Sequence, residues 1–220
     1  MSVLDKTLQA QWDDALATMP LVAILRGLRP DEALGVGEMI IRAGFKVLEV
    51  PLNSPDPFDS IAAMAAAFKG RAIVGAGTVL KVADVERLAQ VGGQICISPN
   101  ANVDVIRAAK AHRLISFPAF FTPTEAFAAI DAGADAIKLF PAELAGPAGL
   151  KAMKAVFPKT MPVFPVGGVT ADNMHTYLDV GAKGFGIGTA VFKPGDTAEI
   201  VYKKAKAFTD AWAKLHPAQN

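Results

Sequence analysis

The chain has 220 residues, of which 52% are hydrophobic, enough for one large domain with a sizeable core. Its 22 basic and 21 acidic residues leave a net charge of +1, which excludes the strongly basic surface of a nucleic-acid-binding protein. The single cysteine, Cys96, excludes an internal disulfide and indicates a reducing compartment. Because the sequence shows neither a signal-peptide pattern nor an apolar run of roughly 20 residues, we expect a cytoplasmic protein without a membrane span.

The first predicted element is an amphipathic helix within residues 1–19. Apolar side chains recur there at helical spacing: Leu4, Leu8, Trp12, Ala15, Leu16 and Met19. We expect this helix to cover the bottom of the domain, where it would shield core side chains from water.

Eight short apolar runs follow, separated by stretches of helical periodicity. Their repeat of about 20 to 25 residues is typical of strand–helix units. The runs are 21–25, 47–52, 72–76, 94–97, 114–117, 136–140, 162–166 and 184–187. The helical stretches are 30–43, 57–69, 81–91, 103–112, 123–132, 149–157, 171–180 and 197–215.

Runs that are apolar on both faces indicate parallel strands covered by helices. Eight such units could form a closed barrel or an open doubly wound sheet, and their near-equal length favours the barrel. The predicted fold is therefore α/β, a (β/α)8 TIM barrel with an extra amino-terminal helix. We expect a single domain over 1–220, with the barrel over 20–192 and a carboxyl-terminal helix within 193–220.

Four polar side chains stand in or directly after the predicted strands: Arg26, Glu49, Thr78 and Lys138. In a barrel of this class the chemistry lies at the carboxyl ends of the strands, so we expect the four to converge on one mouth.

Lys138 is the most informative of these, because a lysine rarely stands in the middle of an apolar strand. Desolvation lowers the pKa of an amine and yields the neutral form that attacks a ketone. Glu49 would then be the acid/base that moves protons beside it. The alternative is that Lys138 and Glu49 form a buried structural ion pair.

Arg26 can hold a substrate carboxylate in a fork of donors, and Thr78 could donate to the same carboxylate. The alternative for Arg26 is a surface pair with Asp31 or Glu32.

Glycine-containing turns follow the seventh and eighth predicted strands, at Gly167-Gly168 and at Gly188-Thr189. These turns are the usual phosphate site of such a barrel, because glycine lets backbone N–H groups approach the phosphate and a short helix after the turn presents its positive end. The Thr189 hydroxyl would be a further donor. The pattern therefore predicts a phosphorylated substrate.

The three histidines, His112, His175 and His216, fall in predicted helices or near the carboxyl terminus, so we expect no histidine-bound metal. No glycine pattern after the first strand fits a dinucleotide, and we expect no cofactor. The aromatic loop 117–123 either walls the pocket or makes a subunit contact.

The chain resembles the KDPG/KHG aldolase family in six segments, which occur in the family's order between about Pro20 and Phe192. The segments are 23–27 (AILRG), 48–54 (LEVPLNS), 75–80 (GAGTVL), 98–100 (SPN), 137–141 (IKLFP) and 166–169 (VGGV). The resemblance implies a homotrimeric barrel that cleaves a phosphorylated keto acid by class I, Schiff-base chemistry, giving pyruvate and glyceraldehyde 3-phosphate.

The resemblance also implies a role for each site residue by position. Lys138 would be the Schiff-base lysine and Glu49 the acid/base, while Arg26 and Thr78 would contact the keto-acid end. The remaining positions would hold the phosphate (Gly167, Gly168, Gly188 and Thr189) or line the pocket (Pro99 and Phe140).

Within the family, the chain resembles members that act on 2-dehydro-3-deoxy-6-phosphogalactonate. Phosphogluconate-type members commonly have an arginine four positions after the glutamate, where this chain has Asn53, and Arg26 would take over its role. The family often has Pro-Gly at the fifth strand, where this chain has Pro118-Ala119. The alternatives are the C4 epimer 2-dehydro-3-deoxy-6-phosphogluconate or both epimers, a non-covalent phosphate-binding isomerase or synthase, and a non-catalytic sugar-phosphate sensor.

Overall fold

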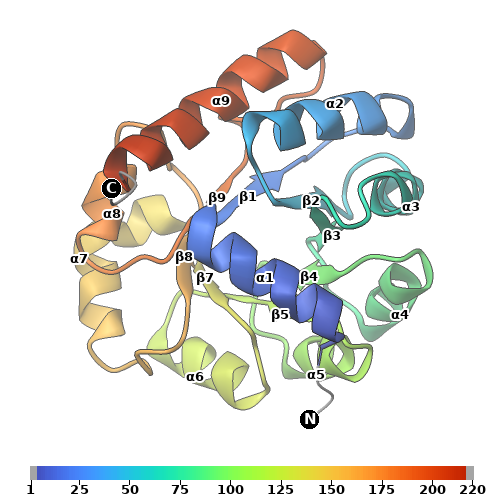
Figure 1. Cartoon of the computed structure of the whole chain (residues 1–220). Coiled ribbons are helices and arrows are strands. Elements are labelled where there is room, and N and C mark those ends of the chain that lie inside the picture. Colours follow the sequence, from blue (N-terminus) through green and yellow to red (C-terminus); the bar gives the residue numbers. More distant parts are fainter. Residues whose placement is uncertain (1–3, 217–220) are drawn as a thin grey trace.

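The computed structural model describes residues 4–216, in which parallel strands are surrounded by helices (Figure 1). The strands are β1 (Leu21–Ile24), β2 (Val47–Pro51), β3 (Ile73–Gly77), β4 (Ile95–Ile97), β5 (Ile115–Phe117), β6 (Ala119–Phe120), β7 (Ile137–Leu139), β8 (Val163–Pro165) and β9 (Phe185–Ile187). The helices are α1 (Lys6–Thr18), α2 (Pro30–Ala43), α3 (Pro57–Ala67), α4 (Val82–Gln90), α5 (Val103–Ala111), α6 (Pro123–Asp131), α7 (Ala142–Lys154), α8 (Met174–Leu178) and α9 (Ala198–Leu215). The parts of the predicted end segments that fall on 1–3 and 217–220 lie outside the described residues. Across 4–216, no helix combines the length and the apolar character needed to cross a membrane.

The strands pair in parallel and form two groups. One sheet has the order β5-β4-β3-β2-β1-β9, and the other has the order β6-β7-β8. A bridge between Val166 and Gly186 joins the two groups beyond the end of β8. The predicted α/β class, with parallel strands alternating with helices, is therefore confirmed.

The fifth predicted strand is present as β5 but continues into a second short strand, β6. Pro118 separates the two, because proline has no N–H group to donate to a neighbouring strand. Its carbonyl accepts a hydrogen bond from the Lys138 N–H at 3.0 Å. The chain thus pairs with β4 before Pro118 and with β7 after it.

Two predicted helices have other bounds than expected. The helix expected over 149–157 is found only up to Lys154, as the second part of α7, which begins at Ala142 and is kinked at Gly146 (φ 64°, ψ 177°) next to Pro147. The helix expected over 171–180 is confined to α8, because the Asn173 side chain accepts from the Thr170 N–H at 2.9 Å and holds the preceding residues in a turn.

Helix α1 lies across the amino-terminal ends of the strands (Figure 1). Its Trp12 side chain is 4% exposed, and the indole lies 6.5 Å from the rings of Phe117 and Phe164. These three belong to an apolar cluster built from α1 and the inward faces of the strands, which also contains Leu4, Leu8, Ala15, Val22, Val47, Ile73, Ile95, Ile97, Ile115 and Ala136. A larger core fills the space between the strands and the outer helices. The amino-terminal ends are thus sealed, and the polar strand residues are left to the carboxyl-terminal ends.

Replacing Trp12 by alanine should lower the free energy of unfolding by about 3–5 kcal/mol, because the variant leaves a cavity between α1 and the strands. Urea unfolding followed by circular dichroism measures this. Lys6→Ala, an exposed change on the same helix, should stay within about 0.5 kcal/mol of the parent. If Trp12→Ala lowered the free energy of unfolding no more than the control does, the packing of α1 against the amino-terminal ends of the strands would not stabilise the fold.

Candidate active site

The carboxyl-terminal ends of the strands surround a hollow of about 330 Å³. The structure brings all ten predicted site residues to its wall: Arg26, Glu49, Thr78, Pro99, Lys138, Phe140, Gly167, Gly168, Gly188 and Thr189. They come from β1, β2, β3, β4, β7, β8 and β9 or the segments directly after them. Residues far apart in sequence therefore meet at one mouth.

Lys138 and Glu49 are the only charged side chains buried in the described part of the chain, with 6% and 2% exposure. In this part of the chain neither takes part in a salt bridge, and Glu49 Oε2 has no hydrogen-bond partner. The alternative of a direct structural ion pair between them is therefore wrong. Both groups bear the free-energy penalty of desolvation without a direct partner.

Burial changes the protonation of both groups. Desolvation raises the pKa of Glu49 to about 7, against the opposing influence of the positive charges on Lys138 and Arg26. Desolvation lowers the pKa of Lys138 from its ordinary value; Glu49 opposes this shift, and Arg26 adds to it. The site thus combines a carboxyl that titrates near neutral pH with an amine whose pKa is lower than that of an exposed lysine. Proton transfer and nucleophilic attack require such a combination.

Gly77, at the end of β3, makes room for the Glu49 carboxyl. A Cβ atom at Gly77 would lie 1.7 Å from Glu49 Oε2, so any side chain there would displace the carboxyl. The next residue, Thr78, has a φ of 56°, a left-handed conformation that β-branched residues rarely adopt. Such strain is concentrated at functional sites. Gly77 is not among the predicted site residues, although the glycine-rich run Gly75-Ala76-Gly77 at the end of the strand could have indicated it.

Arg26 is oriented by Asn53, which follows β2. The Arg26 Nη1 group donates a hydrogen bond of 2.6 Å to Asn53 Oδ1. Asp31 and Glu32 pair instead with Arg29, at 3.1 and 3.6 Å. The predicted alternative of a surface pair for Arg26 is therefore wrong, and within residues 4–216 its guanidinium forms no salt bridge.

The glycine turn after β8 has the open backbone that was predicted. Gly167 and Gly168 have φ values of 105° and 68°, which suit glycine and few other residues. The Glu143 side chain packs against this turn, and a Cβ at Gly167 would lie 2.0 Å from Glu143 Oε2. Glu143, which follows the Phe140-Pro141 pair shortly after β7, is not among the predicted site residues.

The short helix expected behind the glycine turns does not directly follow the second turn in the described structure. The N–H groups of Val191 and Phe192 both donate to the Gly188 carbonyl, at 2.9 and 3.1 Å, and form a single turn. Pro194 follows directly and cannot continue a helix. The donors at this end of the hollow are therefore turn N–H groups and the Thr189 hydroxyl, without a helix end behind them.

Residues 117–123 do not line the hollow. Phe117 and Phe120 are buried in the core, whereas Phe121 is 42% exposed. The prediction that this loop walls the pocket is wrong, and a subunit contact stays a prediction.

The three histidines lie on exposed positions away from the hollow. Within residues 4–216 there is no group of three or more histidine, cysteine, aspartate or glutamate side chains placed to hold a metal ion.

Comparison with known proteins identifies the family of this site. Residues 12–203 match the family described as KDPG and KHG aldolase. The chain belongs to this family. It is therefore an aldolase, a carbon–carbon lyase, and the hollow at the strand ends is its candidate active site.

Two relatives and one solved structure are similar over nearly the full chain. The probable 2-dehydro-3-deoxy-6-phosphogalactonate aldolase of Rhizobium meliloti (strain 1021) is 46% identical over 200 residues, which cover 91% of this chain and 94% of the relative. The 2-dehydro-3-deoxy-6-phosphogalactonate aldolase of Escherichia coli (strain K12) is 44% identical over 202 residues, which cover 92% and 97%. A solved structure described as native KDPGal superimposes with a TM-score of 0.88 at 41% identity and covers 97% of this chain and 98% of that one.

Gly77→Ala should lower kcat/KM for aldol cleavage about 100-fold or more, because the added methyl group displaces the Glu49 carboxyl from its place beside Lys138. The matched control is Gly35→Ala in α2, where a Cβ meets nothing within 4 Å and activity should be unchanged. Steady-state kinetics and a thermal melt of both variants provide the measurement. A folded Gly77→Ala enzyme with parental activity would contradict a catalytic position for Glu49.

Proposed function

We propose that the protein is a class I aldolase that cleaves 2-dehydro-3-deoxy-6-phosphogalactonate to pyruvate and D-glyceraldehyde 3-phosphate. The observation that carries this proposal is the buried Lys138, which has no salt bridge in the described structure and lies beside a buried carboxyl that titrates near neutral pH. A structural lysine would be expected to pair with an acidic group, whereas a nucleophilic lysine needs its neutral amine.

In this mechanism the Lys138 amine attacks the C2 ketone of the substrate. The carbinolamine loses water and becomes a protonated imine. Loss of the C4 hydroxyl proton breaks the C3–C4 bond, and the electron pair moves into the imine to give an enamine while the aldehyde leaves. Protonation of the enamine at C3 and hydrolysis of the imine then release pyruvate and restore the lysine.

Glu49 is the group that moves these protons. A carboxyl with a pKa of about 7 can donate and accept protons at neutral pH, which dehydration of the carbinolamine and protonation of the enamine both require. Its Oε2 atom has no hydrogen-bond partner among residues 4–216, so it can bind a reacting hydroxyl or a water molecule.

The two ends of the substrate bind at opposite sides of Lys138. Arg26, held by Asn53, binds the carboxylate with Thr78 as a second donor, and Pro99 and Phe140 line the wall between. The Phe140 ring centre is 5.3 Å from Lys138 Nζ and covers the amine. Gly167, Gly168, Gly188 and Thr189 bind the phosphate through backbone N–H groups and the threonine hydroxyl.

Two observations support the galactonate epimer. The similar proteins from R. meliloti and E. coli carry that substrate in their names. In addition, the carboxylate-binding arginine of this chain is Arg26 on the β1 side, oriented by Asn53, where the gluconate-type pattern has an arginine at the asparagine's position.

We also propose that the strands close into a single-domain (β/α)8 barrel. The Val166–Gly186 bridge and the hydrogen bond of 3.4 Å from the Ala136 N–H, just before β7, to the Ser116 carbonyl in β5 support this, because they link the two sheets at both junctions. The enzyme is proposed to be a cytoplasmic homotrimer. Its exposed apolar side chains on and beside α6 and α7 suit a subunit contact: Phe121, Phe127, Leu144 and Val156.

Comparison of kcat/KM for the two C4 epimers tests the proposed substrate. We expect the galactonate epimer to be preferred about tenfold or more, which is the discrimination that a change in polar contacts to one hydroxyl can give. A Lys138→Met variant gives the background rate. Equal rates, or a preference for the gluconate epimer, would overturn the assignment.

A further inference from the structure

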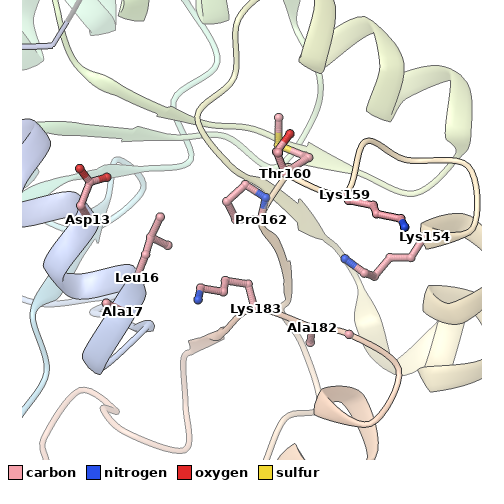
Figure 2. A pocket seen from close by; sticks show the side chains of 11 residues that line it. Asp13, Leu16, Ala17, Lys154, Lys159, Thr160, Pro162, Ala182 and Lys183 are labelled. Atoms are coloured by element: carbon pink, nitrogen blue, oxygen red, sulfur yellow. The ribbon is translucent and has the colours of Figure 1, made fainter.

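A second hollow, of about 430 Å³, lies beside α1 at the amino-terminal ends of the strands (Figure 2). The active site opens at the opposite, carboxyl-terminal ends. The walls of the second hollow are α1, the end of α7 with the loop that leads to β8, and residues 181–183 before β9. Its volume is in the usual range for small-molecule sites.

Three lysines from separate segments line this hollow: Lys154, Lys159 and Lys183. None of them forms a salt bridge with any residue of the described structure, although five other lysines do: Lys46, Lys110, Lys203, Lys204 and Lys206. Asp13 is the only acidic residue in the lining. Three positive charges against one negative charge leave a net charge of +2 in the wall.

Lys154 is held in place by the chain opposite it. Gly181 has a φ of 92°, and a Cβ atom there would lie 2.9 Å from Lys154 Cε, so the lysine stem packs against the glycine. Figure 2 shows its amine pointing across the hollow. Lys154 is partly withdrawn from water, and desolvation lowers its pKa with no carboxylate to oppose the shift. An anion in the hollow would supply the missing counter-charge.

On its α1 side the hollow is lined by a carboxylate, Asp13, whereas the lysines line the other walls. Asp13 accepts a hydrogen bond of 2.9 Å from Gln9 Nε2, which leaves its other carboxylate oxygen for a donor from a ligand. In Figure 2 Asp13 and Lys154 stand on opposite sides of the hollow, with Lys183 between them.

We propose that this hollow binds a small metabolite with at least two negative charges, from phosphate or carboxylate groups, and a hydroxyl group that faces Asp13. The lysines bind the anionic groups, and the site is separate from the active site and independent of the aldol reaction. Binding in this hollow is independent of which epimer the enzyme cleaves.

Residue-resolved acetylation of lysines tests the proposal, with pyrophosphate and citrate as probes for phosphate and carboxylate. We expect at least one of them to slow the acetylation of Lys154, Lys159 and Lys183 about threefold or more at constant ionic strength. The control is Lys151, in the same last turn of α7 but outside the hollow, which should react unchanged. Because each lysine is measured by itself, binding at the glycine turns of the active site does not affect the result.

A pair of variants makes the test quantitative. Lys154→Gln/Lys183→Gln should weaken binding of the protective anion about tenfold or more in calorimetry, and Lys151→Gln should leave it unchanged. Both variants should keep the parental kcat/KM for aldol cleavage, which shows that they are folded. The proposed site would be overturned if the probes slowed the acetylation of Lys151 as much as that of the three lysines, or if neither probe slowed it. It would also be overturned if the two variants bound the anion with equal affinity.

Discussion

The burial of Lys138 and Glu49 without a direct ion pair is the constraint on which the rest of the structure depends. Two charged groups in an apolar interior are unfavourable, and a direct salt bridge would be the usual way to reduce the penalty. Here both side chains are nearly inaccessible to water and the carboxyl has an unpaired oxygen. The penalty raises the pKa of Glu49 to about 7 and lowers the pKa of Lys138, and it thereby supplies the reactivity that the aldol reaction needs.

The fold keeps this unfavourable pair in place because helices and neighbouring side chains pack around it. Helix α1 seals the amino-terminal ends of the strands through Trp12, and the outer helices cover the other faces. Gly77 leaves the space that the Glu49 carboxyl fills, and Asn53 orients the Arg26 guanidinium. The reacting groups are therefore enclosed by packed residues, which suits a reaction in which a small misplacement lowers the rate.

Much of this arrangement can be predicted from the sequence, because the apolar runs and the helical stretches differ in period and because Lys138 and Glu49 interrupt apolar strands. The division of the fifth strand at Pro118 and the kink of α7 at Gly146 are tertiary outcomes that periodicity does not reveal. Glu143 packs against Gly167, and the Glu49 carboxyl fills the space that Gly77 leaves. Both are contacts between segments distant in sequence, so no local pattern predicts them. The absence of a direct salt bridge between Lys138 and Glu49 depends on how β2 and β7 are placed in space, which no local sequence pattern predicts.

The most direct test of the account is to trap Lys138 with pyruvate and borohydride at pH 7.5 and to map the modified peptide. An ordinary lysine, with a pKa near 10.4, is almost fully protonated at this pH, whereas an amine with a lowered pKa has a much larger neutral fraction. The account predicts a reduced pyruvate adduct on Lys138 and none on the exposed Lys69, which serves as the internal control. An enzyme that is active in aldol cleavage but keeps Lys138 unmodified would contradict it.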